Sequence, residues 1–138
     1  MSDHDRIDAG SRRIIQAWPE VFGTGPWPLD RSLLAFGFEC GPGWHLLIDR
    51  LCRDLAVLIR EDGLTGFRVQ QVKEKFGGLR FYCSGGNDRV HARIDQAEAE
   101  SAITCEACGL RPSPIRCRGG WYSTRCDPCH DRMRRERG

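Results

Sequence analysis

The stretch from Thr104 to His130 reads TCEACGLRPSPIRCRGGWYSTRCDPCH and holds two Cys-x-x-Cys pairs. Cys105 and Cys108 form the first pair, and Cys126 and Cys129 form the second after a gap of 17 residues. Each pair places two sulfurs on one tight turn, at the separation that Zn–S bonds of about 2.3 Å require. We therefore expect one structural Zn²⁺ held by these four cysteines. Two disulfides, or four unrelated buried thiols, are the alternative interpretations.

The residues around these pairs predict a complete small finger. Between the pairs, Ile115–Cys117 and Trp121-Tyr122 are separated by Gly119-Gly120, which indicates a short hairpin. The residues after the second pair read HDRMRRERG and are mostly good helix formers. The second pair would then lie at a helix start, where the helix dipole favours thiolates. We call the turn that carries Cys105 and Cys108 the knuckle. The knuckle, the hairpin and the helix together predict a treble-clef-like zinc finger over residues 105–138.

Upstream of the finger, the sequence predicts an α+β domain over residues 1–104 that continues directly into it. Apolar residues at helical spacing indicate a short helix over residues 9–18 and a longer one over residues 44–61. On the longer helix, Arg50 and Asp54 have the i,i+4 spacing of a surface ion pair. The fold class that follows is helices packed on a small antiparallel hairpin, with the finger at the C-terminus.

The hairpin of this domain is expected from β-branched and aromatic residues on both sides of a glycine pair. Strands are predicted at about residues 67–73 and 79–83, with Gly77-Gly78 supplying positive φ in the turn. Gln70-Gln71 interrupt the alternation of apolar and polar residues, which suggests a bulge or an edge. A further helix is expected over residues 88–102, with a narrow buried stripe made of Val90, Ile94, Ala97 and Ser101.

Charge is distributed unevenly along the chain, whose formal net charge is +2. Residues 111–138 hold eight arginines and three acids, formally +5, which leaves −3 for the remainder. Such a basic end indicates possible contact with nucleic-acid phosphates, whereas interleaved acids favour a solvated helix end. If the finger binds nucleic acid, the expected contacts are Arg116, Arg118, Arg125, Arg132, Arg134 and Arg135.

The cysteine spacing is similar to that of GATA-type DNA-binding fingers, and Trp121 lies between the pairs as a tryptophan does there. That resemblance implies nucleic-acid binding, although nine residues after Cys129 make a shorter helix than sequence-specific readout requires. The pattern also resembles HNH endonucleases, whose metal site needs a general base and further ligands. No His or Asn occurs between Cys108 and Cys126, so the residues for that chemistry are missing.

Three segments together resemble an uncharacterised family of small bacterial and phage proteins. The segments are a GxGW helix start, here Gly41 to Trp44, the hairpin QVKEKFGGLRFY at residues 71–82, and a terminal CxxCG...W..T.C..C. The resemblance covers about residues 41–130. It implies the same fold and a cytoplasmic bacterial or phage origin, but no particular activity.

The sequence favours binding over catalysis. It contains no G-x-S-x-G, P-loop or GxGxxG motif and no apolar run near the roughly 20 residues of a membrane span. The scattered remaining cysteines fit a reducing cytosol. We therefore expect a cytoplasmic, non-enzymatic protein with no membrane partner and no evident small-molecule substrate. An enzyme site built from His45, His91 and acids is a further possibility that requires these residues to converge.

The expected partner is another protein, with nucleic acid as the alternative. Small bacterial domains of this kind often act as immunity proteins that neutralise a toxin, or as phage accessory factors. Aromatic and arginine side chains commonly anchor interfaces, which points to the aromatic-rich region from Val21 to Phe38 and to the charged side of the hairpin. The candidate residues for a protein partner are Trp27, Phe36, Lys73, Lys75 and Arg80.

Overall fold

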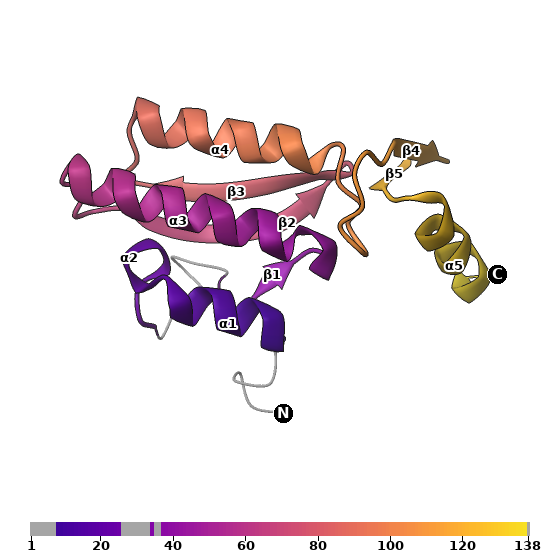
Figure 1. The fold of residues 1–138 in the computed structure, drawn as a ribbon, viewed down its shortest axis with the longest axis horizontal. Helices are drawn as coiled ribbons and strands as arrows, with labels where there is room; N and C mark the ends of the chain where they lie inside the picture. The colour runs from indigo at the N-terminus through magenta and orange to yellow at the C-terminus, as the bar shows by residue number, and fades with distance from the viewer. Residues whose placement is uncertain (1–7, 26–33, 35–36, 138) are drawn as a thin grey trace.

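The structure is a computed structural model that describes residues 8–25, 34 and 37–137. Its elements follow in the order α1 (Ala9–Ala17), α2 (Pro19–Phe22), β1 (Phe38–Glu39), the 3-10 turn η3 (Pro42–Trp44), α3 (His45–Glu61), β2 (Arg68–Lys75), β3 (Gly78–Ser84), α4 (Asp88–Ser101), β4 (Ile115–Arg118), β5 (Trp121–Thr124) and α5 (Asp127–Arg137). The expected mixture of helices with small sheets is confirmed. Figure 1 shows a body formed by α1 to α4 and β1 to β3, with β4, β5 and α5 projecting from one end. Within the described residues, no helix is long and apolar enough to cross a membrane.

The hairpin of the body is longer and turns one residue earlier than the sequence predicts. β2 and β3 pair from Arg68↔Ser84 to Lys75↔Gly78, so Gly78 belongs to a strand. The turn consists of Phe76 and Gly77, with φ of 55° and 82°. Positive φ at both turn residues matches the right-handed twist of the strands, which explains why a phenylalanine tolerates this conformation here. The expected bulge is confirmed by a register shift between Val69 and Gln71.

A short parallel strand completes the sheet, and it lies within residues 34–39, where the sequence suggests a short strand. β1 pairs with β2 through Phe38↔Val72 and Glu39↔Lys73, giving the order β1-β2-β3. The buried Ser11 hydroxyl links this strand to α1, because it accepts from the Phe38 N–H at 3.1 Å and donates to Asp8 Oδ2 at 2.6 Å. Asp8 also caps α1 by accepting from the Ser11 N–H at 2.8 Å.

The core lies between the sheet and the two longer helices of the body. α3 and α4 run side by side across one face of the sheet (Figure 1), and α1 and α2 pack beside α3. The predicted stripe of α4 is confirmed, because all four of its residues are buried. Asp54 of α3 does not pair with Arg50 as predicted; it accepts a hydrogen bond from Arg93 of α4 at 2.8 Å, which joins the two helices.

Side chains of α4 cap the outer edge of the sheet. The Leu79 N–H donates to Ser101 Oγ at 2.9 Å, and the Phe81 N–H donates to Glu98 Oε2 at 3.0 Å. Unpaired edge groups of this kind otherwise attract a further strand. The edge of β3 is therefore closed to strand addition at these two residues.

Candidate metal centre

The finger folds locally around its two cysteine pairs. In the first pair, the Cys105 N–H donates to the Leu110 carbonyl at 2.9 Å and the Gly109 N–H donates to the Cys105 carbonyl at 2.8 Å. Gly109 has a φ of 86°, a conformation that glycine adopts without steric cost. Cys126 directly precedes α5, and Cys129 lies in its first turn. The predicted hairpin between the pairs is confirmed by β4 and β5, and the predicted helix by α5.

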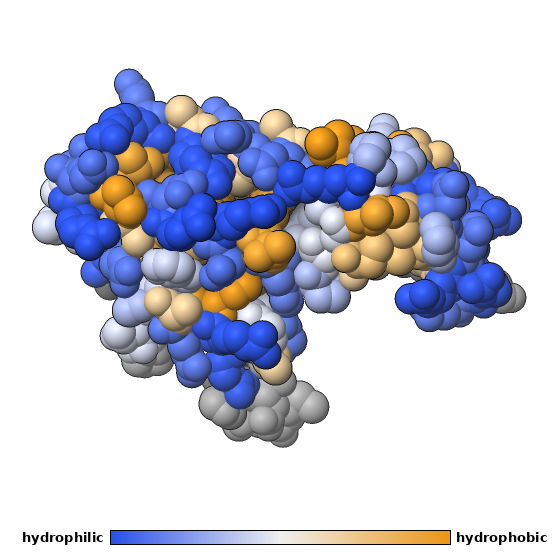
Figure 2. All heavy atoms as spheres, viewed as in Figure 1, coloured by the Kyte–Doolittle hydropathy of each residue, from blue (hydrophilic) through white to orange (hydrophobic). Residues whose placement is uncertain are grey.

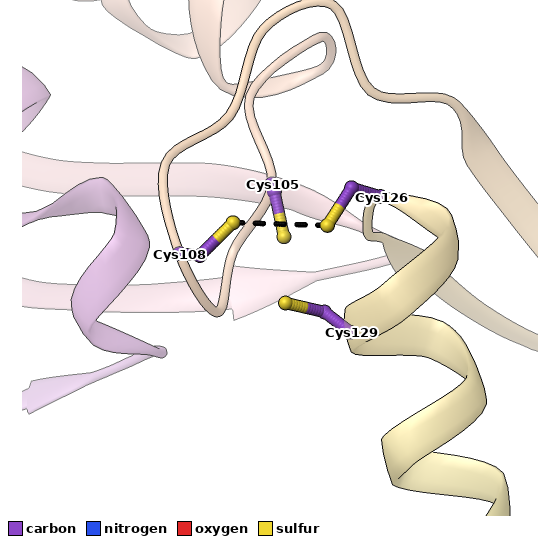
Figure 3. A group of neighbouring side chains, drawn as sticks. All are labelled: Cys105, Cys108, Cys126 and Cys129. Carbon is purple, nitrogen blue, oxygen red and sulfur yellow. Dashed lines mark hydrogen bonds between the residues drawn. The ribbon is translucent and has the colours of Figure 1, made fainter.

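All four cysteine side chains of these pairs point to one common point (Figure 3). Their sulfurs lie within 4.8 Å of one another, and those of Cys108 and Cys126 are 3.7 Å apart. Four sulfurs placed about 2.3 Å from a central Zn²⁺ form a tetrahedron with edges of about 3.8 Å. The separation is far longer than a disulfide bond of about 2.05 Å, and all four thiols are free. The disulfide and unrelated-thiol interpretations are therefore wrong.

The electrostatics of the cluster favour a bound cation. Burial works against the Cys105 thiolate, but backbone N–H groups of Cys126, Cys108 and Ala107 lower its pKa to about 6. Burial and the neighbouring thiols raise the pKa of Cys129 to about 12. Four thiolates packed this closely repel one another, and a divalent metal ion offsets that repulsion. The donor set therefore fits one metal ion with no coordination position left for a substrate.

The first cysteine pair packs against the segment from Gly41 to Trp44, which directly precedes α3. The Gly41 N–H donates to Glu106 Oε2 at 2.9 Å, and the Gly43 N–H donates to the Glu106 carbonyl at 2.7 Å. The indole N–H of Trp44, which is fully buried, donates to the Thr104 carbonyl at 2.8 Å. Burial raises the pKa of the Glu106 carboxyl, which the Gly41 N–H stabilises as an anion. The chain from Gly41 to Trp44 thus acts as a receptor for the knuckle.

Glycine is required in this receptor because the two backbones approach closely. A Cβ atom on Gly41 would lie 2.5 Å from the Glu106 carbonyl oxygen, and one on Gly43 would lie 2.2 Å from that of Cys105. Both distances are shorter than any real Cβ contact. The glycines of the GxGW segment are therefore explained by docking of the metal centre.

The turn of the β2–β3 hairpin contacts the finger from the other side. Thr124, which is fully buried in β5, donates its hydroxyl proton to the Gly77 carbonyl at 2.6 Å. The Thr124 carbonyl accepts from the Glu106 N–H at 2.8 Å, so the hairpin turn, β5 and the knuckle form one network. The rings of Phe76 and Tyr122 meet edge to face, with centroids 6.0 Å apart. The predicted boundary between residues 104 and 105 lies inside this network.

The residues predicted to bind a protein are only partly described. Trp27 and Phe36 lie outside the described residues. Lys73 and Arg80 face each other in register on the side of the sheet away from α3 and α4, as do Gln71 and Tyr82. These four residues form what we call the open sheet face, and Lys75 lies at its end beside the turn, with its Nζ 5.6 Å from the Phe76 ring centre.

The arginines predicted to contact nucleic acid lie around more than one hollow of the finger. Arg116 donates to the Arg125 carbonyl at 3.0 Å and to Asp127. Arg116, Arg118 and Arg134 line one hollow between the finger hairpin and α5, whereas Arg132 and Arg135 do not line it. Figure 2 shows mostly hydrophilic residues over the projecting end, with apolar residues where the finger meets the body.

His45 and His91 do not converge on a common site. His45 begins α3 at the finger end of the body, and His91 lies in the first turn of α4 at the opposite end (Figure 1). Burial lowers the pKa of His45, whose ring packs edge to face on Phe38. The sequence-based interpretation missed Glu106 and Thr124, because no spacing rule marks a carboxylate or hydroxyl that joins two segments.

No family model, curated protein or solved structure matches the chain. Functional assignment therefore depends on the geometry of the chain itself. That geometry comprises a closed site of four cysteines, two docking contacts to the body, and two surfaces that carry cationic and aromatic side chains.

Proposed function

We propose that the chain is a non-enzymatic binding protein whose C-terminal finger is held on the body by one structural Zn²⁺. The observation that carries this proposal is the convergence of four cysteine sulfurs at tetrahedral spacing. Four sulfur ligands favour Zn²⁺ over harder cations such as Mg²⁺ or Ca²⁺, which prefer oxygen. Knuckle, hairpin and helix follow one another in the order of a treble clef, which supports that assignment for the finger.

The zinc would act by positioning and not by catalysis. Cys105 connects to the receptor segment through Glu106, and Cys126 follows β5, which contacts the hairpin turn through Thr124. A metal ion that joins the two cysteine pairs therefore holds both docking contacts at once. Loss of the ion would release a finger that has little apolar core of its own, because β4 and β5 bury only Ser123 and Thr124.

A protein partner with an acidic surface fits the open sheet face. Lys73 and Arg80 are directly opposite each other, an arrangement of like charges that is unfavourable for the sheet itself. Glu39 of β1 lies in register beside Lys73 and accepts a hydrogen bond from Gln71, so the face carries two cationic side chains and one acid. Tyr82 is 40% exposed on the same face and supplies an aromatic contact. Because α4 caps the β3 edge at Leu79 and Phe81, we expect the partner to dock on this face and not to add a strand at that edge. A toxin neutralised by this chain is the partner class that we propose first.

Metal analysis of the purified chain tests the zinc part of this proposal. We expect one Zn²⁺ per chain, and displacement of that ion when the cysteines are titrated with a mercurial reagent. A chain that is folded over residues 105–138 and carries no metal would contradict the assignment.

Charge reversal tests the partner part. We expect the double variant Lys73→Glu, Arg80→Glu to lose a stoichiometric protein partner recovered from the native host, by quantitative pull-down. Arg53→Glu is the matched control, because Arg53 is 63% exposed on α3 and lies away from the sheet. Equal recovery with the double variant and the control would exclude the open sheet face as the interface.

A further inference from the structure

The two faces of the finger hairpin have different surroundings. Ile115, Tyr122 and Thr124 share the face that meets the turn of the body hairpin, as the contacts of Tyr122 with Phe76 and of Thr124 with Gly77 show. The opposite face and α5 enclose a hollow of about 380 Å³. We call this hollow the finger groove; the described residues that line it are Arg116, Arg118, Trp121, Ser123, His130, Met133 and Arg134.

The finger groove is strongly cationic. Three of its lining residues are arginines, and no acidic residue is among the described residues that line it. Arg116 is held by Asp127 and the Arg125 carbonyl. Arg118 and Arg134 are exposed and have no ion-pair partner in the described part of the chain. Two guanidinium groups are therefore available for an anion, and their flat, forked shape suits phosphate oxygens.

An exposed aromatic ring lies beside these charges. Trp121 is 58% exposed and directly opposite Arg118 across the β4–β5 ladder. Met133 of α5 adds a second apolar side chain to the lining. A large apolar ring in a cationic hollow suits a ligand that has both a flat unsaturated ring and a negative charge.

We propose that the finger groove binds single-stranded nucleic acid, with one base stacked on Trp121 and the flanking phosphates on Arg118 and Arg134. Nucleotides combine the two required features, since every base has a stacking face and every linkage carries a charge. Stacking on Trp121 requires an unpaired base, which is why a single strand fits better than a duplex. An acidic peptide would satisfy the arginines but offers no ring at each charged residue. This site is separate from the open sheet face and does not depend on the proposed protein partner.

Fluorescence anisotropy tests the proposal. The zinc-loaded full chain is titrated into a labelled single strand of about 12 nucleotides, once as DNA and once as RNA. We expect binding at about 50 mM salt that weakens roughly 7- to 18-fold at about 200 mM, as two or three phosphate contacts predict. Trp121→Ala should weaken binding by roughly 5- to 150-fold, and Trp121→Phe should restore most of the loss. Arg118→Ala should reduce the slope of log K against log salt by about 0.7.

Two control variants separate the groove from the rest of the surface. Tyr122→Ala removes an exposed aromatic ring from the opposite face of the same hairpin, and Arg53→Ala removes one exposed positive charge from α3. Both should bind the single strand as the parent chain does, and each variant is first checked for one bound metal ion and an unchanged circular dichroism spectrum. Lys73→Glu, Arg80→Glu should also leave this binding unchanged, so the failure of either proposal can be told from that of the other.

Three results of the direct binding measurements would overturn the proposal. They are no binding to either single strand at low salt, equal affinity for Trp121→Ala and the parent chain, and a duplex that binds more tightly than the single strand. Competition by polyglutamate as effective as competition by unlabelled oligonucleotide would also overturn it, and would identify the groove as a site for acidic protein segments.

Discussion

The molecule contains two antiparallel hairpins that turn alike but are stabilised differently. The body hairpin turns at Phe76-Gly77 with φ of 55° and 82°, and the finger hairpin turns at Gly119-Gly120 with φ of 58° and 81°. The body hairpin buries apolar side chains from both strands under helices, namely Val69, Val72, Leu79 and Phe81. The finger hairpin buries only Ser123 and Thr124, and its Trp121, Tyr122 and Ile115 are exposed.

This difference concerns the source of stability, because a structural metal ion can supply stabilisation that otherwise comes from buried apolar side chains. Each buried apolar side chain of the body hairpin contributes about 1.5–3 kcal/mol, whereas the finger hairpin has almost none of this contribution. The strands of the finger bury too little apolar surface for a hydrophobic core alone to support them. We propose that a metal ion held by the four cysteines and a few hydrogen bonds to the body take the place of that core.

Removal of one cysteine should give the largest difference in stability between the two hairpins. In Cys108→Ser we expect residues 105–138 to unfold while α3 and the body hairpin stay folded, because a structural Zn²⁺ supplies roughly 10–16 kcal/mol. Hydrogen exchange read by mass spectrometry measures protection of both parts. Cys108 is exposed, and Cys117→Ser is the matched control, because Cys117 is also exposed but lies outside the cluster. Unfolding of both parts together would show that the body also depends on the metal.

A methyl group in the receptor segment should displace the finger without removing any of the four cysteine side chains. In Gly43→Ala the new Cβ would lie 2.2 Å from the Cys105 carbonyl oxygen, and we expect a loss of about 3 kcal/mol in the free energy of unfolding. Urea denaturation measures this loss, and a chelator competition assay should show faster release of zinc. Gly66→Ala is the control, since no atom lies within 4 Å of its added Cβ. Equal stability of the two variants would mean that the backbone of Gly43 does not pack closely against that of Cys105.

Removal of the Thr124 hydroxyl should weaken the contact between the hairpins more mildly. Thr124→Val keeps the shape of the side chain but leaves the Gly77 carbonyl without its 2.6 Å hydrogen bond, which should cost about 1–3 kcal/mol. Urea denaturation should detect the loss. Thr65→Val, in an exposed turn, should change the free energy of unfolding by no more than about 0.5 kcal/mol.

Acid should weaken the body through Asp8 and His45. Burial raises the pKa of Asp8, but hydrogen bonds from Ser11 and the nearby His45 outweigh it, so the pKa is below its ordinary 3.8. Its stabilisation is therefore complete above that value and is lost as pH falls through the folded pKa. Burial also lowers the pKa of His45 from its ordinary 6.5, so the unfolded chain takes up this proton first and stability starts to fall near that pH.

Two variants isolate these contributions in urea denaturation at several pH values. Asp8→Asn keeps the helix cap without the charge and should remove a few tenths of a kcal/mol of acid sensitivity below about pH 4. His45→Gln should flatten the fall between about pH 7 and pH 5. Unchanged pH profiles in both variants would mean that other groups cause the acid response.

Periodic patterns and ligand spacing carried most of the correct predictions. The buried stripe of α4, the start of α3 after Gly43 and the bulge near Gln70 depend on local spacing, so the sequence reveals them. The cysteine cluster is also predicted from local spacing, because two Cys-x-x-Cys pairs at this separation are typical of a zinc site. The predicted pair of Arg50 with Asp54 failed because Arg93, far away in the sequence, lies closer in space.

The sequence by itself determined most elements of this protein and the four cysteines that could hold a metal ion, since both depend on residues close together in the chain. Only the tertiary structure decided how the parts join. Glu106, Thr124 and the glycines at residues 41 and 43 act across 47 to 65 positions of sequence, through a hydroxyl, a carboxylate and two close backbone approaches. Such contacts have no period, because they depend on where folded segments meet. The same holds for the finger groove, whose arginines belong to β4 and α5 and share one hollow only after the cysteines have brought these elements together.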